Sequence, residues 1–140
     1  MELDNKDYRI LELLKQNSRA SIRDVAKKAN LRPSTVHQRI LKLKEKNIIE
    51  KFTLKLNNKE VGENFIVFML IATEKEIDNK TFNNEHIKEV FGITGEYDIM
   101  LKLKFKDVEE FNNYIIHFRK EQGIKKTLTM VSTITLKEDI

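Results

Sequence analysis

The apolar residues of this chain change their spacing part-way along the sequence, and this change limits the folds that the chain can adopt. Up to residue 45, apolar side chains recur at the three- and four-residue intervals of a helix face. Later, the apolar run Phe65–Ala72 and the alternating segment Tyr97–Phe105 are typical of β-strands. Asn57, Asn58 and Gly62 separate the two patterns. We therefore expect a helical domain over residues 1–50, a strand or hinge linker over 51–63, and a mixed domain over 64–140.

The first part carries start signals for three short helices. Asp4 with Asp7 three residues later, and Ser21 with Asp24, each predict the beginning of a helix. Pro33 fits the first turn of a third helix, because its missing N–H would have no intrahelical partner there. Short helices, a tight turn and a basic last helix predict a helix-turn-helix, whose second motif helix enters the major groove of DNA.

The exposed face of the third helix offers hydrogen-bonding side chains. Val36, Ile40 and Leu43 share the face that must pack on the other helices. At about 100° per residue, Thr35, Gln38 and Lys42 lie opposite this face. They are flanked on one side by Ser34, His37 and Leu41 and on the other by Arg39. Polar and basic groups of this kind contact base edges and phosphates. The predicted DNA-binding residues are Arg32, Ser34, Thr35, His37, Gln38, Arg39 and Lys42.

The charge distribution favours DNA binding over the alternative that Lys and Arg only solvate an ordinary surface helix. Residues 1–56 hold 14 Lys and Arg against 7 Asp and Glu, a net charge of +7. Residues 57–140 hold 12 against 15, a net charge of −3, and the two parts give the +4 of the whole chain. The helical part is therefore the expected binder of a polyanion.

The composition narrows the class of protein. With 40% hydrophobic and 34% charged residues, the chain is typical of globular domains. The absence of cysteine excludes disulfides, thiolate catalysis and cysteine-built metal sites. The start of the sequence lacks the apolar segment of a signal peptide, and Phe65–Ala72 is too short to span a bilayer. We expect a cytoplasmic protein without a membrane partner.

The second part predicts a β-α-β-β-α-β order. Strands are expected at residues 64–73, 87–94, 97–105 and 127–136, with a short helix in 76–86 and a longer one in 107–123. Asp107 begins the longer helix, and Gly123 suits the left-handed position after its end. Residues 48–57 predict a further strand, as a wing or a connector. The expected fold class is α+β, with a ferredoxin-like domain after the three-helix domain.

The number of helices leaves one face of this sheet uncovered. Two helices can cover only one face of four strands, yet the first strand, Phe65–Ala72, is apolar on both sides. We therefore expect the other face to meet a second subunit, so that the protein forms at least a homodimer. A dimer would present two recognition helices to a two-fold-symmetric operator.

The whole arrangement resembles the Lrp/AsnC, or feast/famine, family of prokaryotic transcription regulators. The resemblance rests on "LDNKDYRILELLKQNSRASIRDVAKKANLRPSTVHQRILKLKEKNII", on Val61-Gly62 and on "FGITGEYDIMLKLK", in family order and spacing. It implies a C-terminal domain for effector binding and oligomerisation, and, with the abundance of Lys, Glu, Ile and Asn, a thermophilic archaeal member. The expected partners are double-stranded promoter or operator DNA, further copies of the chain up to a tetramer or octamer, an amino-acid effector and the basal transcription machinery.

Two positions depart from the family pattern. Arg32 stands where the family usually has a serine N-cap, so either the helix start differs or Ser34 takes over the capping. Arg32 is also a candidate phosphate contact. Asn47 replaces the usual glycine at the end of the third helix, and asparagine is the next best residue for a left-handed conformation.

The segment "FGITGEYDIM" (91–100) raises the question of an active site. Its glycines lead into a strand and not into a helix, which excludes a phosphate-binding loop. Glu96 and Asp98 would share a strand face, but neither a nucleophile nor a metal partner accompanies them. By resemblance, the loop lies where the effector pocket of the family forms. The candidate effector residues are Gly92, Thr94, Gly95, Glu96, Tyr97 and Asp98; a purely structural turn, with Gly95 at positive φ, is the alternative.

The sequence predicts a regulator and not an enzyme. The histidines at 37, 86 and 117 lack ligand spacing, so no metal site or other cofactor is expected. A DNA-organising oligomer without effector control remains an alternative to an effector-modulated, sequence-specific regulator. An enzyme of amino-acid metabolism lacks any catalytic motif in this sequence.

Overall fold

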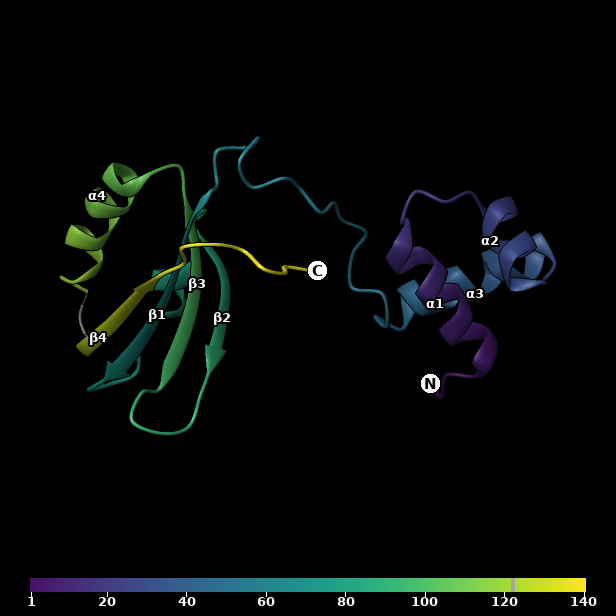
Figure 1. Ribbon diagram of the computed structural model, residues 1–140. Helices are drawn as coiled ribbons and strands as arrows, with labels where there is room; N and C mark the ends of the chain where they lie inside the picture. Colours follow the sequence, from purple (N-terminus) through teal and green to yellow (C-terminus); the bar gives the residue numbers. More distant parts are fainter. Residues whose placement is uncertain (122) are drawn as a thin grey trace. The chain divides into compact units, whose positions relative to one another are not determined.

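The chain consists of two compact units, Met1–Leu54 and Lys55–Ile140. The computed structural model describes residues 1–121 and 123–140. The first unit is helical, and the second contains a sheet with α4 (Val108–Phe118) (Figure 1). The division between the units falls inside the expected linker, 51–63.

The first unit is built from α1 (Asn5–Gln16), α2 (Ile22–Ala29) and α3 (Pro33–Glu45). One apolar stripe from each helix meets the others in a single buried cluster. The buried side chains of this cluster are Ile10, Leu13, Leu14, Val25, Ala26, Val36 and Leu43. The packing face predicted for α3 is confirmed at Val36 and Leu43, which are fully buried.

Local side chains fix the ends of these helices. Asp4 and Asp7 form a reciprocal capping box at the start of α1, with N···O distances of 2.9 and 3.1 Å. The Ser21 hydroxyl accepts from the backbone N–H of Asp24 at 3.0 Å and caps α2. After α3, Asn47 adopts a left-handed conformation with φ +57°, as predicted.

The start of α3 has no side-chain cap. Arg32 occupies the N-cap position with extended backbone, and its side chain makes no capping hydrogen bond. Ser34 does not take over this role, because the helix already begins at Pro33. Proline supplies a preset φ at the first position and needs no partner for a missing N–H. The Arg32 side chain is therefore left exposed to solvent.

The second unit contains the expected ferredoxin-like sheet. Its elements are β1 (Phe65–Thr73), η1 (Asn79–Phe82), β2 (Ile87–Gly92), β3 (Ile99–Phe105), α4 (Val108–Phe118) and β4 (Ile124–Val131). The strands are antiparallel in the order β2-β3-β1-β4. The helix expected within residues 76–86 is only the single 3₁₀ turn η1, since this segment lacks an apolar stripe.

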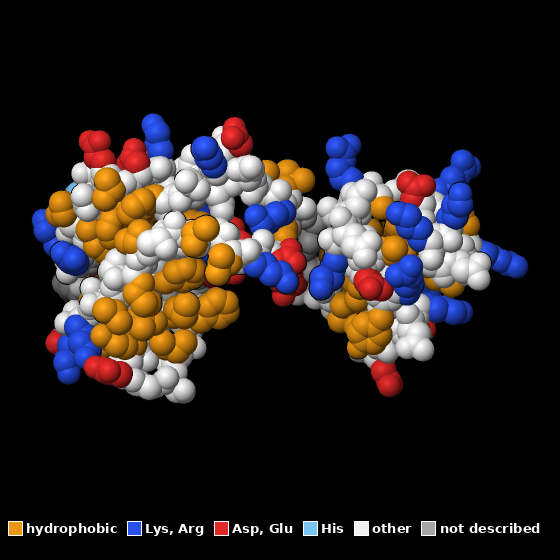
Figure 2. Space-filling view, in the orientation of Figure 1, with side chains coloured by type: hydrophobic (Ala, Val, Ile, Leu, Met, Phe, Trp, Pro, Cys, Tyr) orange, Lys and Arg blue, Asp and Glu red, His pale blue; other side chains and the backbone are white. Residues whose placement is uncertain are grey.

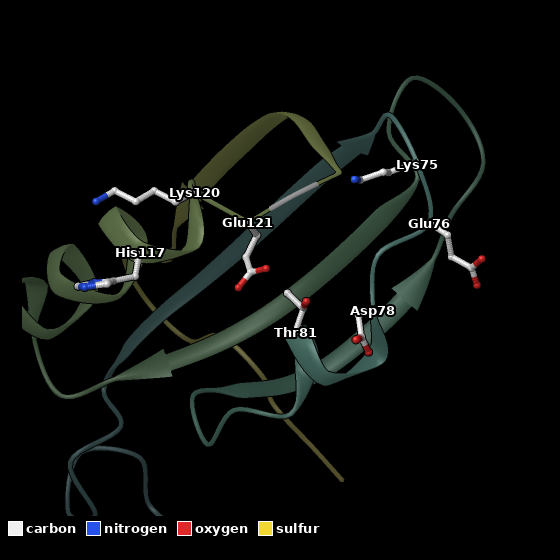
Figure 3. A pocket seen from close by; sticks show the side chains of 7 residues that line it. All are labelled: Lys75, Glu76, Asp78, Thr81, His117, Lys120 and Glu121. Atoms are coloured by element: carbon white, nitrogen blue, oxygen red, sulfur yellow. The ribbon is translucent and has the colours of Figure 1, made fainter.

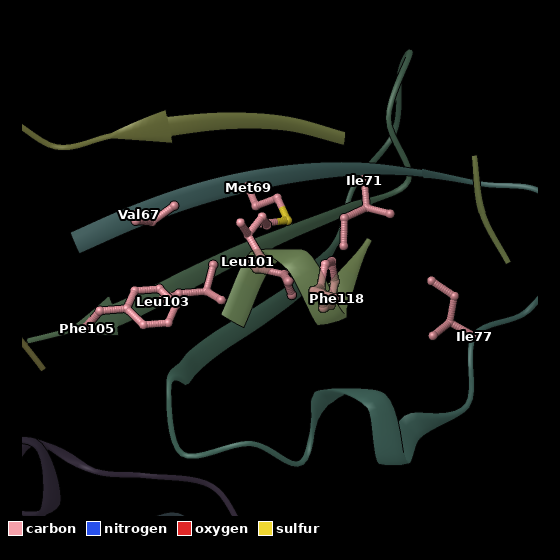
Figure 4. Packing of buried hydrophobic residues seen from close by; sticks show 9 residues of the cluster. Val67, Met69, Ile71, Ile77, Leu101, Leu103, Phe105 and Phe118 are labelled. Carbon is pink, nitrogen blue, oxygen red and sulfur yellow. The ribbon is translucent and has the colours of Figure 1, made fainter. Parts of the chain in front are cut away.

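One face of the sheet packs on α4 and forms the core of this unit (Figure 4). Val67, Met69 and Ile71 alternate along β1 toward this side and are fully buried. The same cluster contains Leu101, Leu103, Phe105, Ile115, Phe118 and Ile77. Gly123, expected in the left-handed region after α4, has φ +90°.

Two strand predictions were wrong: one strand does not form, and the other ends earlier than expected. Residues 46–64 contain no strand, although the segment 48–57 alternates, and Phe52, Leu54 and Leu56 are 48, 66 and 50% exposed. The expected strand 127–136 ends at Val131, where its partner β1 begins; Ser132 donates the last bond, to the Ile66 carbonyl. An alternating pattern needs a neighbouring backbone to become a strand, and these segments have none in the described chain.

The C-terminal segment lies on the sheet face that α4 leaves open. Glu138 pairs with Lys102 and with Lys104, both on this face of β3, and accepts from the Asn58 amide at 2.9 Å. Burial alone would raise the pKa of the Glu138 carboxyl. Hydrogen bonds from Lys102, Asn58 and Lys104 outweigh this effect and hold the pKa well below its usual range. The carboxylate therefore stays ionised and ties the chain end to β3.

Candidate DNA-binding helix and effector loop

The predicted DNA-binding residues fall into two groups on α3. Five side chains are exposed: Arg32, Ser34, His37, Gln38 and Lys42. Thr35 and Arg39 are half-buried, because their positions turn toward the flank of the buried stripe. The expectation that Thr35 lies opposite the core is therefore wrong.

Arg39 is engaged inside the first unit. Its guanidinium donates to both carboxylate oxygens of Asp4, at 2.7 and 2.9 Å, and to Asp7 at 2.9 Å. The backbone N–H of Asp7 and the Arg39 guanidinium lower the pKa of Asp4 to about 2. The same two carboxylates raise the pKa of Arg39. Arg39 joins α3 to the capping box of α1.

The exposed face of α3 also holds a residue to which the sequence assigned no role. Leu41 is 51% exposed, although it is large and apolar. Helical spacing places it on one flank of the polar face, together with Ser34 and His37. The sequence signal that could have identified Leu41 is its position, because it is an apolar residue outside the buried stripe of α3.

Further basic side chains are exposed on the first unit. Arg19, Arg23, Lys27 and Lys28 on and before α2 are exposed. Figure 2 shows Lys and Arg side chains spread over the visible surface of this unit. Such charges attract phosphate without regard to sequence.

The candidate effector loop is the connection between β2 and β3, residues 93–98. The Ile93 N–H donates to the Asp98 carbonyl at 2.9 Å and closes the loop. Gly95 has φ +128°, a conformation that favours glycine, so the expected turn is present. The β3 strand begins at Ile99, so Glu96, Tyr97 and Asp98 belong to the loop. The expectation that they lie on a strand was wrong.

The two carboxylates of this loop have different partners. Asp98 accepts from the Thr73 backbone N–H at 2.8 Å and from the Thr73 hydroxyl at 3.1 Å. Glu96 accepts from Lys126 on β4 at 2.8 Å, and this contact lowers the pKa of Glu96. The Lys126 ammonium also lies 5.0 Å from the ring centroid of Tyr97. Asp98 anchors the loop, whereas Glu96 and Lys126 form an ion pair at its surface.

Comparison with known proteins assigns both units. A winged helix-turn-helix DNA-binding model matches residues 3–50, and the model of the Lrp/AsnC ligand binding domain matches residues 68–140. The chain belongs to the Lrp/AsnC family. It is a helix-turn-helix transcription regulator, and this family is not one of enzymes, as the sequence predicted.

Relatives of this Lrp/AsnC regulator match along its whole length. The HTH-type transcriptional regulator FL11 of Pyrococcus furiosus is 34% identical over 140 residues, 97% of this chain and 93% of the relative. An HTH-type transcriptional regulator of Pyrococcus horikoshii is 38% identical over 146 residues, 99% of this chain and 97% of the relative.

Solved structures share the fold of both units. A transcriptional regulator from Neisseria meningitidis, solved as a complex with L-methionine, has a TM-score of 0.92 at 21% identity and covers 99% of this chain and 94% of its own. LrpC of B. subtilis has a TM-score of 0.87 at 25% identity and covers 98 and 99%. The α+β fold class is confirmed.

One hollow of the Lrp/AsnC domain lies apart from the candidate effector loop. A hollow of about 550 Å³ lies between the segment around η1 and the end of α4, lined by Lys75, Glu76, Asp78, Thr81, His117, Lys120 and Glu121 (Figure 3). Glu121 points into this hollow and Glu76 points away from it. None of the predicted effector residues lines it.

The described residues, 1–121 and 123–140, offer neither a metal site nor a membrane span. No group of three or more His, Asp or Glu side chains among them is placed to hold a metal ion. None of their helices is long and apolar enough to cross a membrane.

Proposed function

We propose that this regulator recognises operator DNA through the exposed face of α3 and responds to an amino acid through the β2–β3 loop. The observation that carries the DNA part is the group of exposed side chains Ser34, His37, Gln38 and Lys42 on one helix of a basic unit. The buried stripe of the same helix holds this face outward.

The side chains divide into base and phosphate contacts by their chemistry. Gln38 presents an amide, which pairs with the N6 and N7 groups of adenine. Lys42 and Arg32, near the two ends of the face, suit phosphates. Arg39 and Thr35 act indirectly, because they are half-buried and Arg39 is held by Asp4. They orient α3 and leave base contacts to its exposed residues.

The amino-acid site centres on the exposed pair of Glu96 and Lys126. Their side chains are 73 and 46% exposed, so a ligand has access to both charges. A zwitterionic amino acid carries the two groups that would exchange partners with this pair: its carboxylate faces Lys126 and its ammonium faces Glu96. Backbone N–H groups near Gly92 and Gly95 are further donors for the carboxylate. The ligand-binding family model over residues 68–140 and the methionine complex of the Neisseria regulator support this site.

Self-association through the open sheet face completes the proposal. The protein forms homodimers, which assemble further into tetramers or octamers and place two α3 helices on one operator. Operator binding takes place in the cytoplasm, next to the basal transcription machinery.

Footprinting on the promoter of the protein's own gene at physiological salt tests the DNA part. Protection of a defined site is expected, whereas uniform protection would indicate a DNA-organising protein. Gln38→Ala should lose about 1–3 kcal/mol of discrimination between bases. Lys42→Ala should lower the affinity for all DNA sequences alike, and should reduce the slope of log affinity against log salt concentration by about 1. Lys125→Ala, the same change of charge in the second unit, is the control. If both α3 variants bind like wild type, the assignment of this face is wrong.

A thermal-shift screen of the twenty amino acids tests the effector part. A ligand at 100 times its dissociation constant adds about 2.7 kcal/mol to the free energy of unfolding. Glu96→Gln should abolish the shift, and Glu109→Gln, an exposed position on α4, should preserve it. Absence of any shift across the panel would remove the amino-acid site and leave DNA recognition unaffected.

A further inference from the structure

The recognition face of α3 contains one large apolar side chain, that of Leu41. It is 51% exposed, whereas Val36 and Leu43 on the opposite side of the helix are fully buried. Leu41 belongs neither to the buried cluster of this unit nor to the half-buried side chains that pack against it. It therefore contributes nothing to the core, and its exposure has no explanation in the fold of the unit.

The neighbours of Leu41 on the helix are polar. His37 and Gln38 lie one turn before it and Lys44 and Glu45 one turn after it, and all four are exposed. A docking surface for another protein would place an apolar patch around the leucine. A single apolar side chain among hydrogen-bonding groups instead matches the major groove, where base edges are polar except for the C5-methyl group of thymine.

We infer that Leu41 contacts the methyl group of a thymine in the operator and makes the protein selective for thymine at that position. This inference rests on the proposed binding of operator DNA through α3. The axial distance from Gln38 to Leu41 is about 4.5 Å, three residues of helix. One base-pair step is about 3.4 Å. The two side chains therefore face neighbouring base pairs, and Leu41 reads the one next to that read by Gln38.

Two other occupants compete with DNA for the surroundings of Leu41. An open groove of about 600 Å³ borders Leu41, Gln38 and Lys42 and also touches Met1. An apolar partner, or a second copy of the chain, could occupy it. The groove is also lined by Glu2, Asp4, Asp7 and Glu45, and an apolar partner that covered these carboxylates would have to bury their charges. The exposed side of Leu41 is left for the bases.

Replacing thymine by deoxyuridine tests the contact, because it removes only the methyl group and keeps every hydrogen-bonding group of the base. Each thymine of the footprinted operator is replaced in turn, and dissociation constants are measured with the full-length protein. Wild type should lose affinity about fourfold at one thymine per half-site, the value expected for one buried methyl group. Leu41→Ala should bind the thymine and deoxyuridine operators equally.

Two further variants keep the test independent of folding and of general affinity. Leu41→Met retains an apolar tip and should retain part of the deoxyuridine penalty. Leu54→Ala, an exposed leucine of the same unit outside the helices, should keep the full penalty even if overall affinity changes. The readout is the ratio between two operators for each variant, so a uniform loss of affinity does not affect it.

The outcomes separate this inference from the proposed function. Tight binding of the unmodified operator, with no penalty at any deoxyuridine, would overturn the role of Leu41 and leave operator recognition standing. A penalty that persists in Leu41→Ala would assign the methyl contact to another residue and overturn the inference as well. Failure of wild type to select any operator would overturn the proposed function, and the role of Leu41 with it.

Discussion

The guanidinium of Arg39 joins the middle of α3 to the first turn of α1. Asp4 and Asp7 cap α1 and also accept from Arg39, so that one group of three charges fixes a helix start and a helix–helix contact. Asp7 is almost fully buried, at 3% exposure, and its position brings Arg39 toward the protein interior. The orientation of the recognition helix therefore depends on a residue that sequence alone assigned to DNA.

The capping carboxylate gives this contact a defined dependence on pH. The folded pKa of Asp4 is about 2, below its usual 3.8. A lowered pKa means that the carboxylate stabilises the fold above pH 4 and that this contribution is lost as the pH falls from about 4 to about 2. Asp4→Asn keeps a capping oxygen but loses the charge. It should be less stable than wild type above pH 4, and this difference in the free energy of unfolding should shrink as the pH falls from about 4 to about 2.

Urea unfolding of both proteins between pH 7 and pH 2, followed by the helical circular dichroism signal, measures this difference. Glu2→Gln is the control, because Glu2 is exposed and precedes the capping box. Its unfolding midpoint should follow that of wild type at every pH. A deficit in Asp4→Asn that is independent of pH would show that the charge of Asp4 contributes nothing.

Sequence separation decides which of these contacts could be predicted. The caps at Asp4 and Ser21 connect residues three positions apart, and the sequence pattern identified both. Arg39 reaches Asp4 across 35 positions, and Lys126 reaches Glu96 across 30. Such pairs depend on how the elements pack, which no local pattern encodes, so the roles of Arg39 and Glu96 emerged only from the structure.

Among the elements, the β2–β3 loop combines fixed ends with an accessible tip. The Ile93–Asp98 bond closes it, and the Asp98 side chain holds Thr73 at the end of β1. Between these anchors, Gly95 adopts φ +128° with no atom within 4 Å of the position of a Cβ. A substitution there is strained by the backbone conformation alone and not by crowding.

Two glycines of this segment form a matched pair for testing that strain. Gly95→Ala should lower the free energy of unfolding by about 1–3 kcal/mol, the cost of placing a side chain at such a φ. Gly92→Ala also meets open space, but Gly92 lies at the end of β2 without a positive φ. It should be neutral or add about 0.4–1 kcal/mol. Equal effects of the two substitutions in thermal unfolding would contradict the strained turn.

Strand extents show where an element-level prediction from sequence ends. The alternation of β3 identified its residues because both of its neighbours, β1 and β2, come from the same chain. The same alternation in residues 48–57 and 132–136 produced no strand, because no other strand of the described chain pairs with those segments. Periodicity identifies the side chains suited to a sheet, and pairing decides whether a strand forms.

For the whole molecule, the surface that most needs an explanation is the sheet face opposite α4. Phe68, Leu70 and Met100 are half-buried there, and their strand partners Phe91, Leu128 and Met130 are 56, 43 and 43% exposed. Figure 2 shows hydrophobic side chains gathered over the strands of this unit. A continuous apolar surface of this kind favours an interface. A stable dimer buries about 800 Å² on each partner.

Introducing a carboxylate either on the open sheet face or on the outside of α4 tests whether this sheet face carries the proposed homodimer. Leu128 pairs with Leu70 and points away from α4, whereas Ile116 lies on the outer surface of α4 and is 54% exposed. Leu128→Glu would bury a carboxylate without a partner in the interface, and should convert the dimer to a monomer. Ile116→Glu makes the same chemical change outside the interface and should leave the dimer intact.

Sedimentation equilibrium over a range of concentrations distinguishes the two results. If α4 formed the interface, Ile116→Glu would dissociate the protein and Leu128→Glu would not, and the assignment of the faces would be reversed. The DNA affinity of the Leu128→Glu monomer tests what the dimer contributes to operator binding. A monomer presents a single α3, so its affinity for a two-half-site operator should fall toward that for one half-site, while its preference among half-site sequences stays unchanged. Loss of that preference would mean that the dimer shapes α3 itself, and not only the spacing of two copies.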